Sequence, residues 1–321
     1  MIHFTHCGDP NRRHDFVLVF DVSDGNPNGD PDADNQPRQD QETNQGLVTD
    51  VCLKRKVRNF VALTQADEKP NRIYVQDRGT YLNDLNALSH EAVGIPKEKA
   101  KEPERAKRDE ARAWMCANFY DVRMFGAVMS TKVNAGQVRG PLQMTFARSI
   151  DPILPMDVTI SRVALTDEQE KKRSQQESRS EAPSQNEDAS AAVQEERIGR
   201  TGTFGRKAIV PYGLYVGHGF FSAPFAKQTG VTAADLELFW TALMNMWDHD
   251  HSASRGLMSC RGLYVFSHDN ALGNAPAHQL FAKFEHRLKD GVVAPRRFDD
   301  YALILNREMP TGVTLTPLVE G

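Results

Sequence analysis

The stretch "HDFVLVFDVS" at residues 14–23 decides the fold, because its side chains at positions 16 to 20 are all apolar. A strand with one face in water alternates apolar and polar residues, whereas an unbroken apolar run is typical of a strand that is buried on both faces. The run therefore predicts a central β-strand with packed layers above and below it.

The elements around this strand predict an α+β core. Apolar side chains at helical spacing predict a helix over residues 47–63. A second helix is expected at 232–250, where Thr232 is a candidate N-cap. In chain order the core is a strand at 14–23, a helix at 47–63, strands within 136–150 and 204–221, a helix at 232–250 and a strand at 261–269. This βαββαβ series indicates a ferredoxin-like, RRM-type sheet.

Two further segments have helical composition. Residues 96–119 predict a charged surface helix that is interrupted at Pro103. Residues 277–291 predict a helix that ends at Gly291. The chain has no stretch apolar enough to span a membrane and no signal-peptide pattern, so we expect a cytoplasmic protein without membrane association.

A long polar excursion interrupts the second half of the core. No aromatic residue occurs from Ala147 to Thr203, and residues 166–200 are dominated by Ser, Gln, Glu and Arg. Such a segment buries too little apolar surface to offset the entropy of ordering it. Both flanks, 155–165 and 204–221, have strand character, so we expect a long β-hairpin with a flexible tip. A tolerated surface insertion is the alternative.

The overall composition excludes little. The net charge is −4, from 39 basic and 43 acidic side chains, so any polyanion would have to meet a local basic surface. The four cysteines form no C-x-x-C pair, which argues against a disulfide framework and against a thiolate zinc site.

The loop "SDGNPNGDPDADN" at residues 23–35 permits three interpretations. Asp24, Asn26 and Asn28 match the start of an EF-hand loop, but position twelve is Asn35 and the preceding element is a strand. A ribonuclease would use Asp24, Asp30, Asp32 or Asp34 to hold a divalent ion or activate water. The third interpretation is a turn in which Asp and Asn cap their own backbone.

Basic side chains gather in "KRKVR", on the helix that follows this loop. Lys54 and Arg58 lie four residues apart, so they project from one side of the helix and are candidates to grip neighbouring phosphates. An ion-pair ladder with Asp50 is the alternative. Arg38, just after the acidic loop, is expected on the same surface. In "DHDHS", His249 and His251 either ligate zinc or cap the end of a helix.

Several blocks, taken in order, resemble the CRISPR-associated Cas-seven (Cas7) family. These blocks are "NPNGDPDADNQPRQDQETNQGLVTDVCLKRKVRNFV", "DVRMFGAV", "GQVRGPLQMTFARSIDP" and "HDHSASRGLMS", within residues 14–270. They are most similar to the type I-C backbone subunit of the Cascade surveillance complex, also called Csd-two.

This resemblance implies a single domain, 1–321, with a modified ferredoxin-like or RRM palm, finger insertions and a long β-hairpin thumb. The implied ranges are a palm at 14–64, 120–155 and 208–270, fingers at 65–119, and a thumb at about 155–215 with its flexible tip at 166–200. Copies would stack along a CRISPR guide RNA as a filament and present it to target DNA. The implied partners are a Cas-five-type subunit, a large Cascade subunit and a recruited helicase-nuclease. No cofactor and no catalytic activity are expected.

The same resemblance assigns guide-contacting residues. They are Arg38, Lys54, Arg55 and Arg58, the junction residues Phe125 and Gly126, and the further contacts Arg139, Arg206, Lys207 and Arg255. Related type III backbone subunits cut target RNA with an acidic residue in the loop after the first strand. A metal-dependent endoribonuclease that uses loop 24–34 therefore remains the alternative function.

Overall fold

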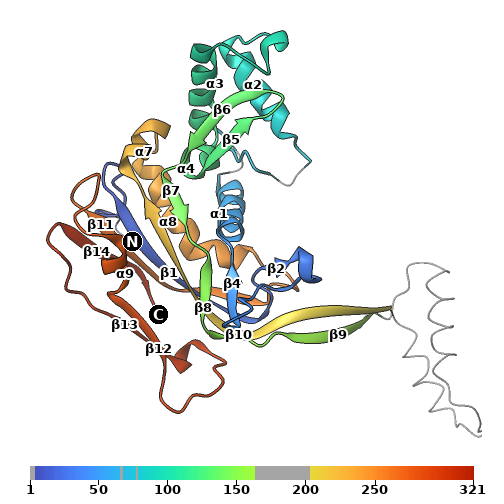
Figure 1. Ribbon diagram of the computed structural model, residues 1–321, viewed down its shortest axis with the longest axis vertical. Helices are drawn as coiled ribbons and strands as arrows, with labels where there is room; N and C mark the ends of the chain where they lie inside the picture. Colours follow the sequence, from blue (N-terminus) through green and yellow to red (C-terminus); the bar gives the residue numbers. More distant parts are fainter. Residues whose placement is uncertain (1–3, 66–67, 77–78, 163–202) are drawn as a thin grey trace, which may run out of the picture. The chain divides into compact units, whose positions relative to one another are not determined.

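A computed structural model describes residues 4–65, 68–76, 79–162 and 203–321 (Figure 1). The chain divides into two compact units, one of residues 1–154 and 210–321 and one of residues 155–209. The predicted flexible tip at 166–200 lies outside the described residues.

An antiparallel sheet forms the centre of the first unit. Its strands lie in the order β14-β11-β1-β10-β8-β4, and a further strand, β7, also pairs with β10. The bounds are β1 His14–Gly25, β4 Gln45–Val48, β7 Leu142–Met144, β8 Ala147–Pro152, β10 Thr203–Phe221, β11 Leu257–His268 and β14 Val313–Glu320. The α+β class is thus confirmed, and β1 is the central strand that the sequence predicts, since β10 and β11 flank it.

The apolar run in β1 serves both faces of the sheet. Phe16, Leu18 and Phe20 belong to one buried cluster, whereas Val17 and Val19 belong to another. This alternation of burial partners is why the run contains no polar residue. β1 therefore joins the two hydrophobic cores of the unit.

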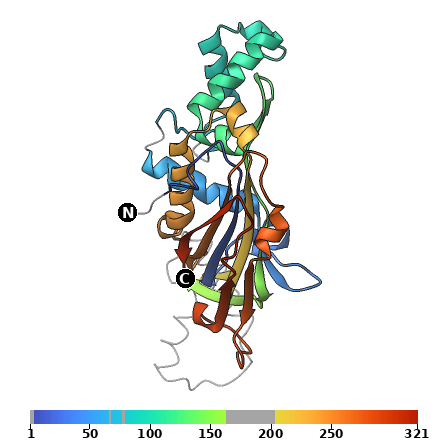
Figure 2. The same ribbon diagram turned by 90° about the vertical axis from the view of Figure 1, so that its left-hand side faces the viewer.

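Helices cover one face of the sheet. α1 (Asp50–Thr64) and α8 (Ala233–Asn245) pack there (Figure 2). The rings of Phe239 and Trp240 meet Phe16 edge-on. α7 (Ala223–Thr229) precedes α8, and a 3₁₀ turn, η3 (Met246–His249), follows it. The predicted N-cap of α8 is confirmed, because Thr232 and Asp235 form a reciprocal capping box.

The opposite face is covered by α9 (Ala277–Phe281) and the hairpin of β12 (Phe284–Leu288) with β13 (Tyr301–Leu305), which begins after η4 (Phe298–Asp300). The prediction of one helix over 277–291 was wrong. The helix ends at Phe281, and residues 284–288 instead hydrogen-bond to β13, which places Phe284 in the core beneath the hairpin.

A smaller layer of α2 (Leu82–Val93), α3 (Arg105–Asn118), β5 (Gly126–Ser130) and β6 (Asn134–Arg139) has its own apolar cluster. The short helices η2 (Lys97–Lys99) and α4 (Tyr120–Phe125) flank α3. The interruption predicted at Pro103 is confirmed, since α3 begins after it, but before Pro103 the predicted helix is only the 3₁₀ turn η2. The single strand expected at 136–150 is instead three short strands, because the chain breaks at Gly140–Pro141 and at Thr145–Phe146.

In the second unit, β9 (Met156–Arg162) pairs antiparallel with residues 203–209 of β10. Strand character is therefore confirmed on both flanks of the polar excursion.

Two buried ion pairs fasten the helices. Arg123 donates to Asp235 at 2.6 and 3.0 Å, which ties α4 to the start of α8. Arg58 on α1 donates to Asp121 at 2.8 Å, and Asp121 also accepts the backbone N–H groups of Tyr74 and Val75. Both oxygens of each carboxylate therefore accept hydrogen bonds from groups inside the protein.

We predict that Asp235→Ala lowers the free energy of unfolding by about 3–5 kcal/mol, because it leaves the Arg123 guanidinium buried without its partner. Urea unfolding followed by circular dichroism measures the loss. Glu110→Ala is the control, since its pair with Lys107 is exposed and contributes less than about 1 kcal/mol. Equal losses in the two variants would contradict this account.

We also predict an acid-sensitive fold. His14 is buried, its Nε2 donates to the Asp9 carbonyl, and its Nδ1 accepts from the Ser267 hydroxyl. Burial lowers the pKa of His14 to about 4, so the unfolded chain binds the proton more readily between that value and about 6.5. Stability is therefore lost as pH falls through this window, by about 2 kcal/mol from about pH 7 to pH 5. In His14→Gln the loss should shrink by that amount, and an unchanged pH dependence would contradict the prediction.

Candidate functional site

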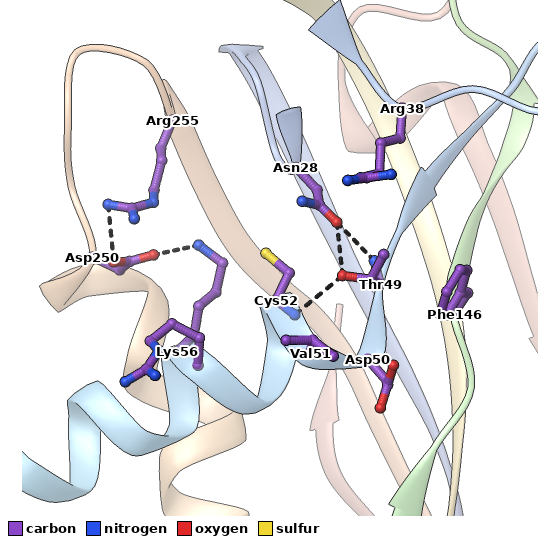
Figure 3. A pocket seen from close by; sticks show the side chains of 11 residues that line it. Asn28, Arg38, Thr49, Asp50, Val51, Cys52, Lys56, Phe146, Asp250 and Arg255 are labelled. Carbon is purple, nitrogen blue, oxygen red and sulfur yellow. Dashed lines mark hydrogen bonds and ion pairs between the residues drawn. The ribbon is translucent and has the colours of Figure 1, made fainter. Parts of the chain in front are cut away.

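A pocket of about 560 Å³ opens at the N-terminus of α1 (Figure 3). Its wall comes from the loop after β1, the first turns of α1, the junction between β7 and β8, and the loop before β11. Segments far apart in the sequence therefore meet here, all of them within the first unit.

Asn28 fastens the loop after β1 to the start of α1. Its Oδ1 accepts both the backbone N–H and the hydroxyl of Thr49, each at 2.9 Å. Thr49 in turn caps α1 by accepting the N–H of Cys52 at 3.2 Å. The positive end of the helix dipole thereby borders the pocket.

Four cationic side chains line the pocket: Arg38, Arg55, Lys56 and Arg255. The carboxylates in the wall are Asp50 and Asp250, so the pocket is net positive. Asp250 accepts from Lys56 with one oxygen, and its other oxygen lies 3.1 Å from Arg255. Arg55 donates to the Val75 carbonyl at 2.8 Å.

Arg38 keeps unused hydrogen-bonding capacity. One of its terminal nitrogens lies 3.4 Å from the Asp30 carboxylate, which is longer than a strong hydrogen bond between an arginine and a carboxylate. Its Nε is buried and has no hydrogen-bond partner among the described residues. A buried donor without a partner is costly. The Arg38 side chain as a whole is 30% exposed, so its terminal nitrogens are the donors that a ligand can meet.

An apolar edge completes the pocket. Phe146 is 51% exposed and Val51 is 66% exposed, although both are large hydrophobic side chains. Figure 3 shows Phe146 at the opposite end of the pocket from the cluster of Lys56, Asp250 and Arg255, with Arg38 and Thr49 between them. The pocket therefore offers a group of cations and an aromatic ring to one ligand.

The structure brings together three of the residues assigned from sequence. Arg38, Arg55 and Arg255 come from three separate segments and line the same pocket. Sequence reasoning missed Lys56 and Phe146. Lys56 lies in the basic run of α1, but its partner Asp250 is 194 positions away, so local spacing gives no sign of the pair.

Lys54 and Arg58 lie inside the protein. Lys54 pairs with Asp50 at 2.9 Å and donates to Gln143 at 3.2 Å, as in the ladder that was the alternative interpretation. Arg58 is buried and pairs with Asp121. Both cations also lie over the ring of Phe125, at 5.8 and 5.1 Å from its centroid. A phosphate contact by either side chain would have to break an internal ion pair.

The remaining assigned residues lie elsewhere. Gly126 has φ +82°, and a Cβ there would come within 2.4 Å of the Val138 carbonyl, so its glycine permits close backbone packing. Arg139 stacks over Phe225 at 4.4 Å. Arg206 and Lys207 lie in the second unit, on β10, where they stand opposite Thr159 and Val158 of β9 in the strand register.

The loop at 23–35 is a compact turn. β2 (Gly29–Asp30) pairs with β3 (Gln36–Pro37), and between them Asp30 caps the 3₁₀ turn η1 (Pro31–Ala33) by accepting the Asp32 N–H. Among the residues that the structure describes, no three His, Cys, Asp or Glu side chains are grouped to hold a metal ion.

Cys52 lines the pocket, but its thiol is held in the protonated, less reactive form. Burial raises the pKa of Cys52, and its Sγ donates to the Pro27 carbonyl at 3.4 Å. All four cysteines of the chain are free thiols.

Across the described part of the chain, no helix is long and apolar enough to cross a bilayer.

Comparison with known proteins identifies relatives. Residues 12–306 match the family model of the CRISPR-associated protein Cas7. A CRISPR-associated protein Cas7 of Haloferax volcanii is 34% identical over 125 residues, which are 37% of this chain and 32% of that protein. The chain thus spans about a third of the length of this curated relative.

Two solved structures are similar at low identity. One is a chain of a CRISPR RNA-guided surveillance complex described as pre-nicking, with 13% identity and a TM-score of 0.45 over 79% of this chain and 78% of that one. The other belongs to a CRISPR RNA-guided surveillance complex, with 11% identity and a TM-score of 0.40 over 79% and 68% of the two chains. Both scores lie below the level that establishes a common fold.

We predict that Asp250→Ala lowers the free energy of unfolding by about 3 kcal/mol, because Lys56 is only 3% exposed and would lose its counter-charge. The double variant Lys56→Met, Asp250→Leu should recover most of this loss, since an apolar pair replaces both charges. Urea unfolding of both variants and of Lys56→Met gives the coupling energy. A double variant less stable than Asp250→Ala would refute the buried pair.

Proposed function

The chain belongs to the CRISPR-associated Cas7 family, and from this membership we propose that it is a guide-RNA-binding backbone subunit of a Cascade surveillance complex. The observation that carries the proposal is the net positive pocket at the N-terminus of α1. A subunit that repeats along a guide meets a different sequence in each copy. It must therefore bind phosphate, ribose and base faces rather than base edges.

We propose that Arg38, Arg55 and Arg255 make the phosphate contacts. Their exposure supports this assignment, since the side chain of Arg38 is 30% exposed and that of Arg255 is 39% exposed. Lys54 and Arg58 hold α1 in place from inside, through Asp50 and Asp121. Arg139, Arg206 and Lys207 are further candidate contacts, the last two from the hairpin of β9 and β10.

The assembly we infer follows the family resemblance of the sequence blocks. The subunit is of type I-C, and copies of it stack along one guide RNA in the cytoplasm as a filament. A Cas-five-type subunit and a large subunit complete the complex, which pairs the guide with target DNA and recruits a helicase-nuclease. The subunit itself is not an enzyme in this proposal.

We also infer an RRM-type palm. The strand order β11-β1-β10-β8 supports it, since this places the fourth, first, third and second strands of the βαββαβ series side by side. Within this proposal the palm comprises 14–64, 120–155 and 208–270, the fingers 65–119 and the thumb about 155–215. The antiparallel pairing of β9 with the start of β10 supports the thumb.

The most direct experiment is to purify the protein from cells that carry its CRISPR array. We expect co-purifying RNA of uniform length, seen as a raised ratio of absorbance at about 260 to 280 nm and as one band on a denaturing gel. Protein free of RNA under these conditions would overturn the proposal. Incubation of the complex with labelled complementary RNA and Mg²⁺ tests for cleavage. Regular cuts that disappear in Asp30→Ala would establish the endoribonuclease instead.

We predict that Arg38→Gln combined with Arg255→Gln weakens binding of the guide RNA and reduces its salt dependence. Each lost phosphate contact should lower the slope of log K against log salt by about 0.7. Fluorescence anisotropy at several salt concentrations measures both quantities. Arg287→Gln is the matched control, because Arg287 is an exposed arginine on β12, outside the pocket.

The variant Lys54→Met separates the two sets of cations on α1. It should lower the free energy of unfolding and leave the salt slope of the folded protein unchanged, because Lys54 is paired internally with Asp50. A reduced slope in Lys54→Met together with an unchanged slope in the Arg38 and Arg255 variant would reverse the assignment.

A further inference from the structure

Phe146 is an aromatic side chain that the core does not use. It is 51% exposed, and among the residues that the structure describes it makes no contact with another aromatic ring. Other large aromatics of the same sheet, such as Phe16 and Phe20, are fully buried and pack against Trp240 and Trp247. Together with Val51, this exposed ring forms an apolar edge beside the cations of the pocket, which a ligand in the pocket can cover.

The backbone presents this ring firmly. Thr145 donates its N–H to the His218 carbonyl at 2.8 Å, and the Thr145 hydroxyl accepts the His218 N–H at 3.1 Å and donates to the Phe146 carbonyl at 3.0 Å. Ala147, the next residue, pairs with Val48 of β4. Phe146 thus lies in a short break between two strands that both pair with β10, and its position is set by the sheet rather than by a free loop.

The opposite side of the pocket supplies charge. Arg38 lies between β3 and β4, and Arg255 lies just before β11. In Figure 3 Arg255 is at the end of the pocket opposite Phe146, and Arg38 lies between them. Val51 extends the apolar edge from the first turn of α1, where it is 66% exposed. The pocket therefore pairs an apolar surface with guanidinium donors for an anion.

Resting on the proposed function, we propose that Phe146 is a base-stacking residue and that the pocket holds one nucleotide of single-stranded RNA. The nucleotide places its phosphate toward Arg38 and Arg255 and its base against the Phe146 ring. Stacking accepts every base because every base has a π-face, which suits a subunit that repeats along an arbitrary guide. A protein ligand would also cover an apolar edge, but the surplus of cations around the pocket favours the phosphate-bearing chain.

The test compares Phe146→Leu with Phe146→Trp in the full-length protein, with single-stranded RNA as the probe. Phe146→Leu keeps an apolar side chain but removes the ring, and it should weaken RNA binding by about 5-fold to 100-fold without changing the salt slope. Phe146→Trp should restore the affinity and show quenching of the new tryptophan when RNA binds. Tyr81→Leu is the control, because Tyr81 is an aromatic residue that is 74% exposed and lies outside the pocket.

The outcomes separate this inference from the function on which it rests. If the Arg38 and Arg255 variant loses affinity while Phe146→Leu retains it, the stacking role is refuted and the RNA interface stands. If neither variant changes RNA affinity, the interface is misplaced and both proposals fall. If Phe146→Leu leaves RNA affinity intact but prevents self-association in sedimentation, the ring contacts a second copy of the chain, and the stacking role is again refuted.

Discussion

The hydrogen bonds between Asn28 and Thr49 are the contacts on which the pocket depends. Because β1 is buried on both faces, the chain leaves the sheet through a polar loop and must return to start α1. The Asn28 side chain ties that loop to the N-cap of the helix, so the start of α1 lies where the loop, Arg38 and the cap residues meet. Together with the hydrogen bond from the Cys52 thiol to the Pro27 carbonyl, this tie fixes the wall of the pocket on the side of β1.

The cations of α1 have two distinct tasks. Lys54, Lys56 and Arg58 face carboxylates of the same chain, and the low exposure of each makes its counter-charge essential. Arg55 lies toward the pocket and donates to the Val75 carbonyl. Basic residues that lie close together in the sequence therefore need not form a basic surface. Their roles are decided by the distant acids that the fold brings to them.

The sequence predicted the parts of the structure whose signals are local. The apolar run of β1 and the capping residues of α8 needed no knowledge of distant partners. The segment 277–291 has apolar residues at helical spacing, but pairing with β13 keeps its second half extended. The acids that pair with Arg58 and Lys56 lie 63 and 194 positions away, and no local pattern reveals them. Phe146 carried no signal at all, since an isolated aromatic between two strands is as typical of a core as of a binding site.

The repeating RNA-binding subunit that we propose must bind RNA tightly whatever its sequence, and the residues of the pocket suit both needs. Arginine and the end of a helix dipole bind phosphates that are the same in every nucleotide. An aromatic face adds affinity that varies little among the four bases. Side chains that read base edges would favour some registers of the guide over others. Thr145, which precedes Phe146, is fixed by its backbone hydrogen bond to His218, and the N-cap of α1 is fixed by the Thr49 hydroxyl, so little backbone ordering entropy would be lost when a nucleotide enters. In the assembly that we propose, each copy along a guide contributes the same modest binding energy, and the affinity of the filament accumulates through repetition rather than through any single strong contact.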